Sequence, residues 1–388
     1  MAGGVTATLV HGSAGEGVTP PWPGLTRDEL APVLAAYPSL GEVHAVTWQA
    51  PRPFAASGLV ACEHAAVFVK RHDRRVRSQA DLLEEHAFIA YLRHAGAAVP
   101  AVLATSRGST APATSNATYE VHALLPHADP YRDAVSWSPF ASLAHARDAG
   151  RALGDLHRAA EGFTAPPRRT GLLVADFRAF GSADPISVLT QRVAAEPLLA
   201  RALANRPWQA DLVRVLMPLH ARLAPHLGAL APLWAHNDFH ASNLLWTGIA
   251  ADAHVAAVLD FGLSNRTSAM FDLATAIERN AVEWLRLGDG ETEIAHADLA
   301  CALIGGYCEA RVVSAAEARA LPLMLPLVHA EFALSELAYF HSVTRSAEDE
   351  AAAYDAFLLG HAAWFYTAAG VEFQAALEGA VEGKSTSF

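Results

Sequence analysis

The sequence predicts an α+β fold in which a smaller, β-rich part precedes a larger, mainly helical part. Short apolar segments of strand length alternate with turn residues over the first third of the 388-residue chain. Beyond Pro126, segments with the periodicity of amphipathic helices take over. The composition, with 52% hydrophobic and 18% charged residues, provides enough apolar surface for a large buried core.

These observations divide the chain into three predicted parts. Residues 1–25 are rich in Gly, Pro, Ser and Thr and are expected to form a flexible arm. Residues 26–125 would form the β-rich part, and residues 126–388 the helical part. A chain of this length is typical of two domains, or of one domain with a smaller lobe.

Two helices and five strands are expected in the β-rich part. Thr26-Arg27-Asp28-Glu29 has the spacing of a capping box, which predicts a helix from there to about Ala36. A second helix is expected over residues 80–94, where apolar residues recur near one face and Gly96 provides a stop. The strands are predicted at residues 43–48, 59–64, 65–72, 102–105 and 118–124.

A strand-like island, residues 233–261, interrupts the helical part. Within it, apolar segments at 244–246 and 255–259 flank a turn and are expected to pair as a hairpin. Polar residues then gather at the open end of that hairpin. The surrounding helical segments are predicted at residues 139–161, 184–228, 269–287, 294–310, 314–342 and 348–378.

The charge balance and the cysteine content restrict the class of protein. With 28 basic and 40 acidic residues, the formal net charge is -12, which argues against nucleic acid or an anionic membrane as partner and is compatible with a cationic substrate. The first residues lack a signal-peptide pattern, and no long apolar run is free of charge or proline, so we expect no membrane span. Three cysteines are too few for a disulfide framework, which is typical of a cytoplasmic protein. No feature of the sequence indicates an oligomeric state.

The densest polar content lies in the island, where Asp238, Asn243 and Asp260 are expected to converge. Phosphoryl transfer requires such a set. One carboxylate orients the attacking hydroxyl and accepts its proton, while an amide oxygen and a second carboxylate hold Mg²⁺. An Asn five residues after the base, followed by Asp-Phe-Gly beyond the hairpin, matches the logic of a kinase catalytic loop.

The motifs resemble those of the aminoglycoside phosphotransferase and choline kinase group, the small-molecule branch of the protein-kinase-like fold. That group carries a loop of the form His-Gly-Asp-Leu-His-Pro-Gly-Asn. This chain matches it at His236, Asp238, His240 and Asn243, and has Asn237, Phe239, Ala241 and Ser242 at the other positions. Further matches, within a resemblance that covers roughly residues 40–340, are Asp260, Asp272-Leu273-Ala274 and the helix that ends in Leu156-His157.

The resemblance implies a two-lobed fold, with a small antiparallel N-lobe over residues 26–125 and a helical C-lobe over residues 126–388. It implies ATP-dependent phosphorylation of a hydroxyl on a small molecule, with Asp238 as the catalytic base. Asn243 and Asp260 would hold Mg²⁺. The identity of the acceptor, a metabolite or an antibiotic, is not readable from the sequence, nor is the choice of ATP over GTP.

Lys70 is one of only two lysines among the 28 basic residues, and the other lies in the polar C-terminal tail. Because surface positions use Arg in this chain, we favour a functional role for Lys70 over that of an ordinary surface lysine. The resemblance implies that it anchors ATP phosphates and pairs with a glutamate of the following helix. Glu85 is the first choice for that partner, because it shares a face with apolar positions, and Glu84 is the second.

Two predictions about the nucleotide site rest on position alone. Glu120, Val121 and His122 would lead into the link between lobes, where backbone groups pair with adenine. The nucleotide loop matches residues 50–58, which contain only Gly58 and two prolines. How that loop would hold phosphates is left open by the sequence.

Two alternatives to a kinase remain at this point. The glycine-poor loop favours a pseudokinase that acts as a partner module. The alternate histidines around Asp238, His236 and His240, with His254 nearby, are compatible with a metal-dependent hydrolase.

Three acidic residues outside the motif loop also have open roles. Glu331 and Glu336 would either neutralise a substrate amine or face water. For Asp272, a structural role at a helix start is favoured over catalysis.

Overall fold

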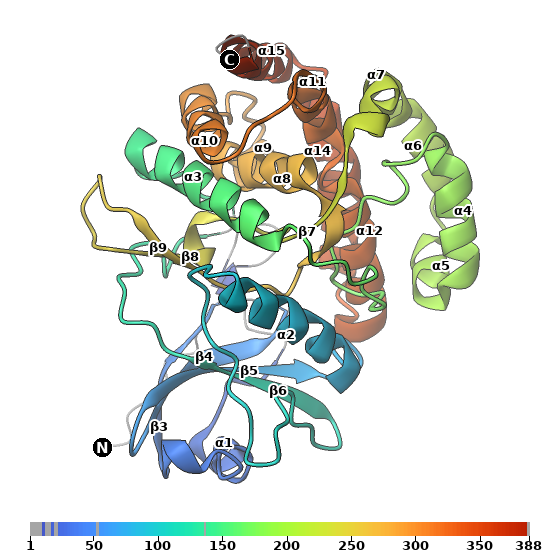
Figure 1. Ribbon diagram of the computed structural model, residues 1–388. Helices are drawn as coiled ribbons and strands as arrows, with labels where there is room; N and C mark the ends of the chain where they lie inside the picture. The colour runs from blue at the N-terminus through green and yellow to red at the C-terminus, as the bar shows by residue number, and fades with distance from the viewer. Residues whose placement is uncertain (1–9, 12–16, 19–21, 52–53, 136, 386–388) are drawn as a thin grey trace. The chain divides into compact units, whose positions relative to one another are not determined.

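The computed structural model describes residues 10–11, 17–18, 22–51, 54–135 and 137–385. The chain divides into two compact units. Unit 1 runs to His94 and includes Val99–Pro126, and unit 2 comprises Ala95–Ala98 and His127–Phe388. Figure 1 shows a sheet with few helices in the first unit and mainly helices in the second, so the α+β class predicted from the sequence is confirmed.

Unit 1 is built on one antiparallel sheet with the strand order β3-β4-β5-β6. Its strands are β3 (Val43–Gln49), β4 (Ala56–Cys62), β5 (Ala66–Asp73) and β6 (Ala117–Ala123). The helices are α1 (Arg27–Leu34) and α2 (Gln79–His94), with the 3₁₀ turn η1 (Pro38–Leu40). A short separate pair is formed by β1 (Val10–His11) and β2 (Gly17–Val18).

The predicted capping box forms only in part. The Thr26 side chain accepts a hydrogen bond from the Glu29 N–H and begins α1, as predicted. The Glu29 carboxylate instead accepts hydrogen bonds from Arg71 of β5, at 2.6 Å, and from the Tyr119 hydroxyl of β6, at 2.9 Å. The side chain expected to close the cap therefore fastens α1 to the sheet.

The core of unit 1 lies between α1 and one face of the sheet. Leu30 and Leu34 of α1 pack with Val60, Val69 and other strand residues that are fully buried. Burial of this face supplies most of the favourable free energy of the unit.

Leu25 belongs to the same cluster, although the sequence places it in a flexible arm. Its N–H and carbonyl both bond the Gln49 side chain, at 3.1 and 2.8 Å. Most of the predicted arm lies outside the described residues, but its last residues are part of the packed unit.

One predicted strand, residues 102–105, is not a strand in the structure. Val102 makes a single bridge to His122, flanked by hydrogen bonds from Leu103 N–H to Val121 O and from Ala123 N–H to Ala101 O. The chain then turns away, because the Thr105 N–H bonds Ser109 O. The main sheet therefore has four strands where the sequence predicts five.

Unit 2 contains two short antiparallel pairs and many helices. The pairs are β7 (Pro232–Ala235) with β10 (Asn265–Ser268) and β8 (Leu244–Trp246) with β9 (Val255–Val258). The helices up to the island are α3 (Leu143–Ala160), α4 (Pro185–Ala195), α5 (Pro197–Leu203), α6 (Trp208–Val215), α7 (Met217–Leu223) and η2 (Ala224–Ala229). The predicted segment 184–228 is thus broken into shorter helices, because prolines recur at their first turns.

The helices that follow the island enclose the core of unit 2. They are η3 (Ala241–Asn243), α8 (Ala269–Ala281), α9 (Trp284–Leu287), α10 (Ala297–Ala310), α11 (Ala315–Met324), η4 (Leu325–Leu327), α12 (Ala330–Tyr339), the π-helical η5 (Phe340–Thr344), α13 (Ala347–Ala351), the π-helical η6 (Ala352–Gly360), α14 (His361–Trp364) and α15 (Ala368–Ser385). The helices α3 and α10 lie in very close contact. A Cβ added at Gly150 would lie 1.9 Å from Leu303 O, so only glycine allows this approach.

The continuous helical run Ala315–Thr344 is long and apolar enough to span a membrane by length and composition, with a mean hydropathy of 1.3 in its most apolar window. However, 94% of that window is buried inside the protein. A buried helix of this composition is what the core of a helical domain requires.

Candidate active site

The predicted hairpin forms, and it places polar residues at its open end. Leu244 of β8 pairs with Val258 of β9, and the Leu259 N–H bonds the carbonyl of Asn243 at 2.8 Å. Asn243 and Asp260 therefore lie at neighbouring positions where the two strands meet the loops.

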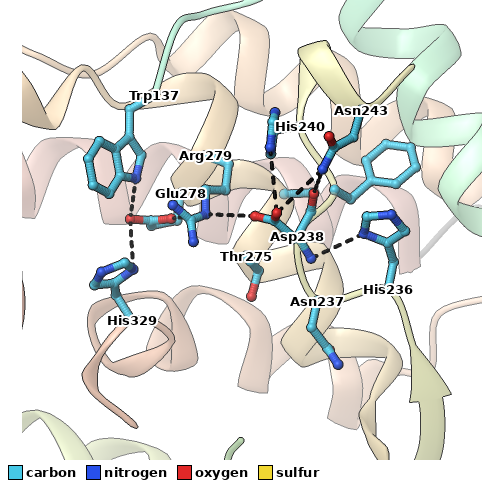
Figure 2. A network of polar contacts seen from close by, with 12 residues as sticks. Trp137, His236, Asn237, Asp238, His240, Asn243, Thr275, Glu278, Arg279 and His329 are labelled. Carbon is cyan, nitrogen blue, oxygen red and sulfur yellow. Dashed lines mark hydrogen bonds and ion pairs between the residues drawn. The ribbon is translucent and has the colours of Figure 1, made fainter. Parts of the chain in front are cut away.

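Asp238 is the centre of a set of polar contacts shown in Figure 2. The amide nitrogen of Asn243 donates to the Asp238 carbonyl at 2.9 Å and approaches its Oδ2 at 3.4 Å. His240 Nε2 lies 3.6 Å from Oδ2, and Arg279 Nε lies 3.4 Å from Oδ1. The side chain retains 19% exposure, so a small molecule can still reach it.

These neighbours set the protonation state of Asp238. Burial opposes ionisation, but His240 and Arg279 outweigh it and hold the pKa of Asp238 well below its ordinary value. The carboxylate is therefore charged at neutral pH. A charged carboxylate can orient a hydroxyl and accept its proton once that proton becomes acidic.

The backbone before Asp238 is held by Asp272 of α8. Its Oδ2 accepts the His236 N–H and its Oδ1 accepts the Asn237 N–H, both at 2.8 Å. His157 Nε2 also lies 3.0 Å from Oδ2, which supports the carboxylate from α3. Asp272 is fully buried and acts on the loop backbone, consistent with the structural role favoured from the sequence.

Asn237 occupies a left-handed backbone conformation, with φ of 61°. The family motif has glycine at this position, and Asn is among the few other residues that tolerate it. Its amide nitrogen lies within 3.2–3.3 Å of the carbonyls of Ala235, Leu263 and Asn265, and its oxygen accepts from the Thr267 hydroxyl at 2.7 Å. The departure from the motif therefore adds a hydrogen-bonding side chain.

Sequence reasoning missed two residues of α8 that support the loop. Arg279 contacts Asp238, and the Asn280 amide bonds both Ala241 N–H, at 2.8 Å, and Phe239 O, at 2.9 Å. They lie seven and eight positions after Asp272, which places all three on one helix face. That spacing is the signal that could have identified them.

The histidines do not form the hydrolase site considered from the sequence. His236 Nε2 donates to Leu259 O at 2.7 Å, and its Nδ1 accepts the Asp238 N–H at 3.2 Å, so both ring nitrogens are used by the loop. The exposed His254 bonds Asp148 at 3.0 Å. These contacts argue against a metal held by the His236, Asp238 and His240 set.

Asn243 and Asp260 have the oxygen donors that Mg²⁺ prefers. Because the Asn243 nitrogen is directed at Asp238, its amide oxygen is the atom suited to a cation. Asp260 is half-buried, with a left-handed backbone at φ 55°, and one of its oxygens accepts the Gly262 N–H at 3.2 Å. A carboxylate and an amide oxygen at one end of a hairpin fit a magnesium ion.

In unit 1, Lys70 of β5 lies opposite Glu120 of β6 in the strand register. Its side chain is largely buried, and Nζ lies 3.8 Å from Glu120 Oε1. Glu85 is also buried in unit 1, whereas Glu84 is half-buried, so burial favours Glu85 as the acidic residue of α2. The carboxylate of Glu120 thus lies beside the Lys70 ammonium.

Glu120 is enclosed by three histidines that the sequence did not connect with it. His72 Nε2 lies 3.0 Å from Oε1, and His86 and His122 lie 3.1 and 3.0 Å from Oε2. Burial alone would raise the pKa of Glu120, but Lys70 and His122 hold it well below its ordinary value. The side chain is therefore a buried anion with partners on both oxygens.

The predicted adenine contact at residues 120–122 is not supported by the backbone. These residues lie inside β6, where Glu120 and His122 pair with β5 and the Val121 carbonyl accepts from Leu103. The strand ladder uses their backbone groups, and β6 ends only at Ala123. The strand predicted over residues 118–124 is thus observed at Ala117–Ala123, and residues 120–122 belong to it.

The single glycine of the predicted nucleotide loop lies within β4. A Cβ at Gly58 would lie 2.3 Å from the Trp48 carbonyl oxygen, so glycine is required for the close approach of β3 and β4. Residues 52 and 53 of the loop lie outside the described residues.

Glu331 takes neither of the roles considered for it. Its Oε1 accepts the backbone N–H groups of Ala179 and Phe180, at 2.8 and 3.1 Å, and Arg192 lies 3.5 Å from Oε2. It holds a buried segment in place. Glu336 is likewise buried rather than exposed to water, and its Oε2 lies 3.4 Å from His329 Nε2.

Known proteins resemble the chain in sequence and in fold. A homoserine kinase from Methylobacterium radiotolerans is 31% identical over 201 residues, which cover 50% of this chain and 51% of that enzyme, so the match spans about half of its length. A microcompartment-associated aminopropanol kinase aligns with a TM-score of 0.51 at 19% identity, covering 92% of this chain and 98% of that one. An amicoumacin kinase aligns with a TM-score of 0.54 at 15% identity, covering 89% and 92%.

The two structural similarities confirm the protein-kinase-like fold predicted from the motifs. The model of the phosphotransferase enzyme family matches residues 59–321. That match reaches from β4 past α8 and includes the whole loop around Asp238 together with the residues that support it. The chain therefore belongs to the phosphotransferase enzyme family.

Proposed function

We propose that the protein transfers the γ-phosphoryl group of ATP to a hydroxyl group of a small molecule. The observation that carries the proposal is the setting of Asp238, a charged and partly exposed carboxylate held by Arg279, His240 and Asn243. Membership of the phosphotransferase family supports the same reaction class.

In the proposed reaction, Asp238 accepts a hydrogen bond from the acceptor hydroxyl and so directs its oxygen at the γ-phosphorus. A new P–O bond forms to that oxygen as the bond between the γ-phosphorus and the bridging oxygen breaks, and ADP leaves. The hydroxyl proton passes to Asp238 late in the step. Because Asp238 is a weak base, it acts mainly by orientation.

Lys70, Asn243 and Asp260 are proposed to meet the charge of the phosphates. Lys70 would contact the phosphates, with Glu85 as its acidic partner. Asn243 and Asp260 would hold Mg²⁺, which supplies charge neutralisation on the phosphate oxygens when bound. Replacement of any of these residues should lower both the affinity for nucleotide and the turnover.

We propose a small amino alcohol as the acceptor. The relative that is 31% identical is a homoserine kinase, and homoserine carries an amino group and a hydroxyl. The net charge of -12 is compatible with a cationic substrate. We expect the protein to act in the cytoplasm, where ATP is available.

Replacement of Asp238 tests the reaction class. Asp238→Ala should lower ADP release with any accepted hydroxyl compound by about 10²–10⁴-fold, the usual contribution of such a group. His254→Ala, at an exposed histidine, is the matched control and should leave turnover unchanged. Unchanged turnover in Asp238→Ala would contradict the assignment. A panel of amino alcohols, neutral polyols and aminoglycosides, read by ADP release, identifies the acceptor class.

A thermal shift with Mg-ATP separates the kinase from a pseudokinase that binds no nucleotide. We expect stabilisation that depends on Mg²⁺ and is lost in Lys70→Ala, because a ligand stabilises only the state that binds it. Stabilisation without turnover of any acceptor in the panel would favour a nucleotide-binding pseudokinase.

A further inference from the structure

A second polar cluster lies in unit 2 beside the loop residues, and the proposed reaction does not use it. It comprises Glu278 of α8, His329 just before α12, Glu336 of α12 and His361 at the start of α14, and is called here the histidine–glutamate cluster. All four side chains are at least 94% buried. Figure 2 shows Glu278 and His329 facing one another next to Arg279.

Buried polar atoms of this cluster have no hydrogen-bond partner among the residues that the structure describes. They are Glu278 Oε2, His329 Nε2, Glu336 Oε2 and His361 Nδ1. Leaving a buried polar atom unpaired costs about 1–3 kcal/mol. His329 Nε2 and Glu336 Oε2 face each other at 3.4 Å, and Glu278 Oε2 faces Arg279 Nε at 3.6 Å. His361 Nδ1 is therefore the unpaired atom that indicates a further occupant of the cluster.

The spacing of the atoms distinguishes between possible occupants. His329 Nδ1 and His361 Nδ1 lie 3.7 and 3.6 Å from the same oxygen, Glu278 Oε1. Ligands at 2.0–2.2 Å from a tetrahedral metal lie about 3.3–3.6 Å apart. The acceptors of an ammonium group, at about 2.9 Å from nitrogen, would lie roughly 4.7 Å apart. The two distances from the histidine nitrogens to Glu278 Oε1 match a metal ion.

The surrounding groups are those that usually orient metal ligands. His329 presents its second nitrogen, Nε2, to Glu336 at 3.4 Å, as in carboxylate–histidine–metal arrangements. Trp137 Nε1 donates to Glu278 Oε1 at 2.9 Å and fixes the rotamer of that carboxylate. The ligand atoms offered by Glu278, His329 and His361 all lie within 4.8 Å of one another.

We propose that Glu278, His329 and His361 bind a divalent transition metal, with zinc as the ion that best fits two imidazoles and a carboxylate. The ion would join the end of α8 to the starts of α12 and α14. It would also draw Glu278 away from Arg279, whose Nε lies 3.6 Å from Glu278 Oε2 and 3.4 Å from Asp238 Oδ1. Arg279 would then pair with Asp238 alone.

Metal content and thermal stability test this site in the full-length protein. Protein dialysed against zinc and then against metal-free buffer should retain about one zinc per chain, and chelation should lower Tm. His361→Ala and His329→Ala should lose the ion, whereas His254→Ala should keep it. Wild-type protein without bound metal and without a zinc-dependent Tm change would overturn the proposal, as would zinc retained equally in both cluster variants.

A further variant covers the case in which the alanine variants do not fold. His361→Cys supplies a thiolate in place of the imidazole, so the cobalt-loaded protein should gain a sulfur-to-metal charge-transfer band that the wild type lacks. Absence of that band in folded, cobalt-loaded His361→Cys protein would contradict the assignment of His361 as a ligand.

Discussion

Glu120 of unit 1 and Glu278 of unit 2 are both almost completely buried carboxylates, yet their surroundings differ. Each oxygen of Glu120 has histidine partners at hydrogen-bonding distance, and Lys70 adds a positive charge. One oxygen of Glu278 accepts from Trp137, while the other has no hydrogen-bond partner among the described residues. Burial alone therefore does not distinguish a carboxylate that stabilises the fold from one that is available to bind a metal ion. The distinction lies in whether both of its oxygens already have hydrogen-bond partners.

The difference follows from how the two units bring donors together. In unit 1, His72, Glu120 and His122 lie on adjacent paired strands, and their spacing of two places them on one face of the sheet, which α2 meets with His86. In unit 2, Glu278 comes from α8, His329 from the turn before α12 and His361 from α14, and no ladder fixes their spacing. A site assembled in this way is more readily completed by a bound ion.

The largest expected effect is that of Glu120→Ala. Removing the anion leaves three buried histidines and Lys70 without their shared partner, and breaking a buried ion pair from one side costs about 3–5 kcal/mol. Urea unfolding of the variant should show a loss of that size. A loss below about 1 kcal/mol would mean that Glu120 is not the structural anion described above.

Asp272→Ala should have the next largest effect, since this carboxylate also has partners on both oxygens. The His236 and Asn237 N–H groups would be buried without acceptors, at about 1–3 kcal/mol for each group. Turnover should fall more than stability predicts, because the backbone that carries Asp238 loses its anchor. Asp252→Ala, at an exposed aspartate, is the control, and equal turnover in the two variants would contradict the anchoring role.

The local sequence pattern was enough to predict the loop around Asp238, but not the contacts that hold it in place. The spacing of Asp238, Asn243 and Asp260 is read along one short segment, so their placement at one end of a hairpin could be predicted. Helical spacing links Arg279 to Asp272 on one face of α8, but it does not predict the contact of Arg279 with Asp238, 41 positions earlier. The contacts of Glu120 with residues of β5, β6 and α2 are likewise not encoded in one segment. They depend on tertiary packing.

The errors in the first third have a similar physical origin. Residues 102–105 have the composition of a strand, but the turn at Thr105 ends the pairing after one bridge. Residues 120–122 were expected to lead into the link between lobes and to offer backbone groups to adenine, whereas their backbone groups are used by the strand, which ends at Ala123. Strand ends are set by the partner strand and are therefore poorly encoded by the strand itself.

Glu331 is a third buried carboxylate, and it differs from Glu120 and Glu278 in its partners. It accepts hydrogen bonds from backbone N–H groups and has an acidic residue, Asp176, nearby. Burial, together with Asp176, raises its pKa to about 7, against the opposing effect of Arg192. A raised pKa in the folded state means that its stabilising contribution is fully present below about pH 4.5 and is lost as the pH rises through about 7. Glu331→Gln should flatten the fall of Tm between these pH values. An unchanged pH profile would contradict the raised pKa.

The smallest effect is expected for Glu278→Gln in protein freed of metal by a chelator. The glutamine retains an oxygen for the Trp137 N–H. Arg279, 3.6 Å from the oxygen that is lost, keeps Asp238 as its anionic partner, so unfolding in urea should change by less than about 1 kcal/mol. When zinc is added, the wild type should gain stability and the variant should not, because a neutral amide is a poor ligand for zinc. The same substitution would then change the stability very little without metal and strongly with zinc present. A large loss of unfolding free energy in the metal-free state would instead mean that Glu278, like Glu120, is an anion that the fold requires.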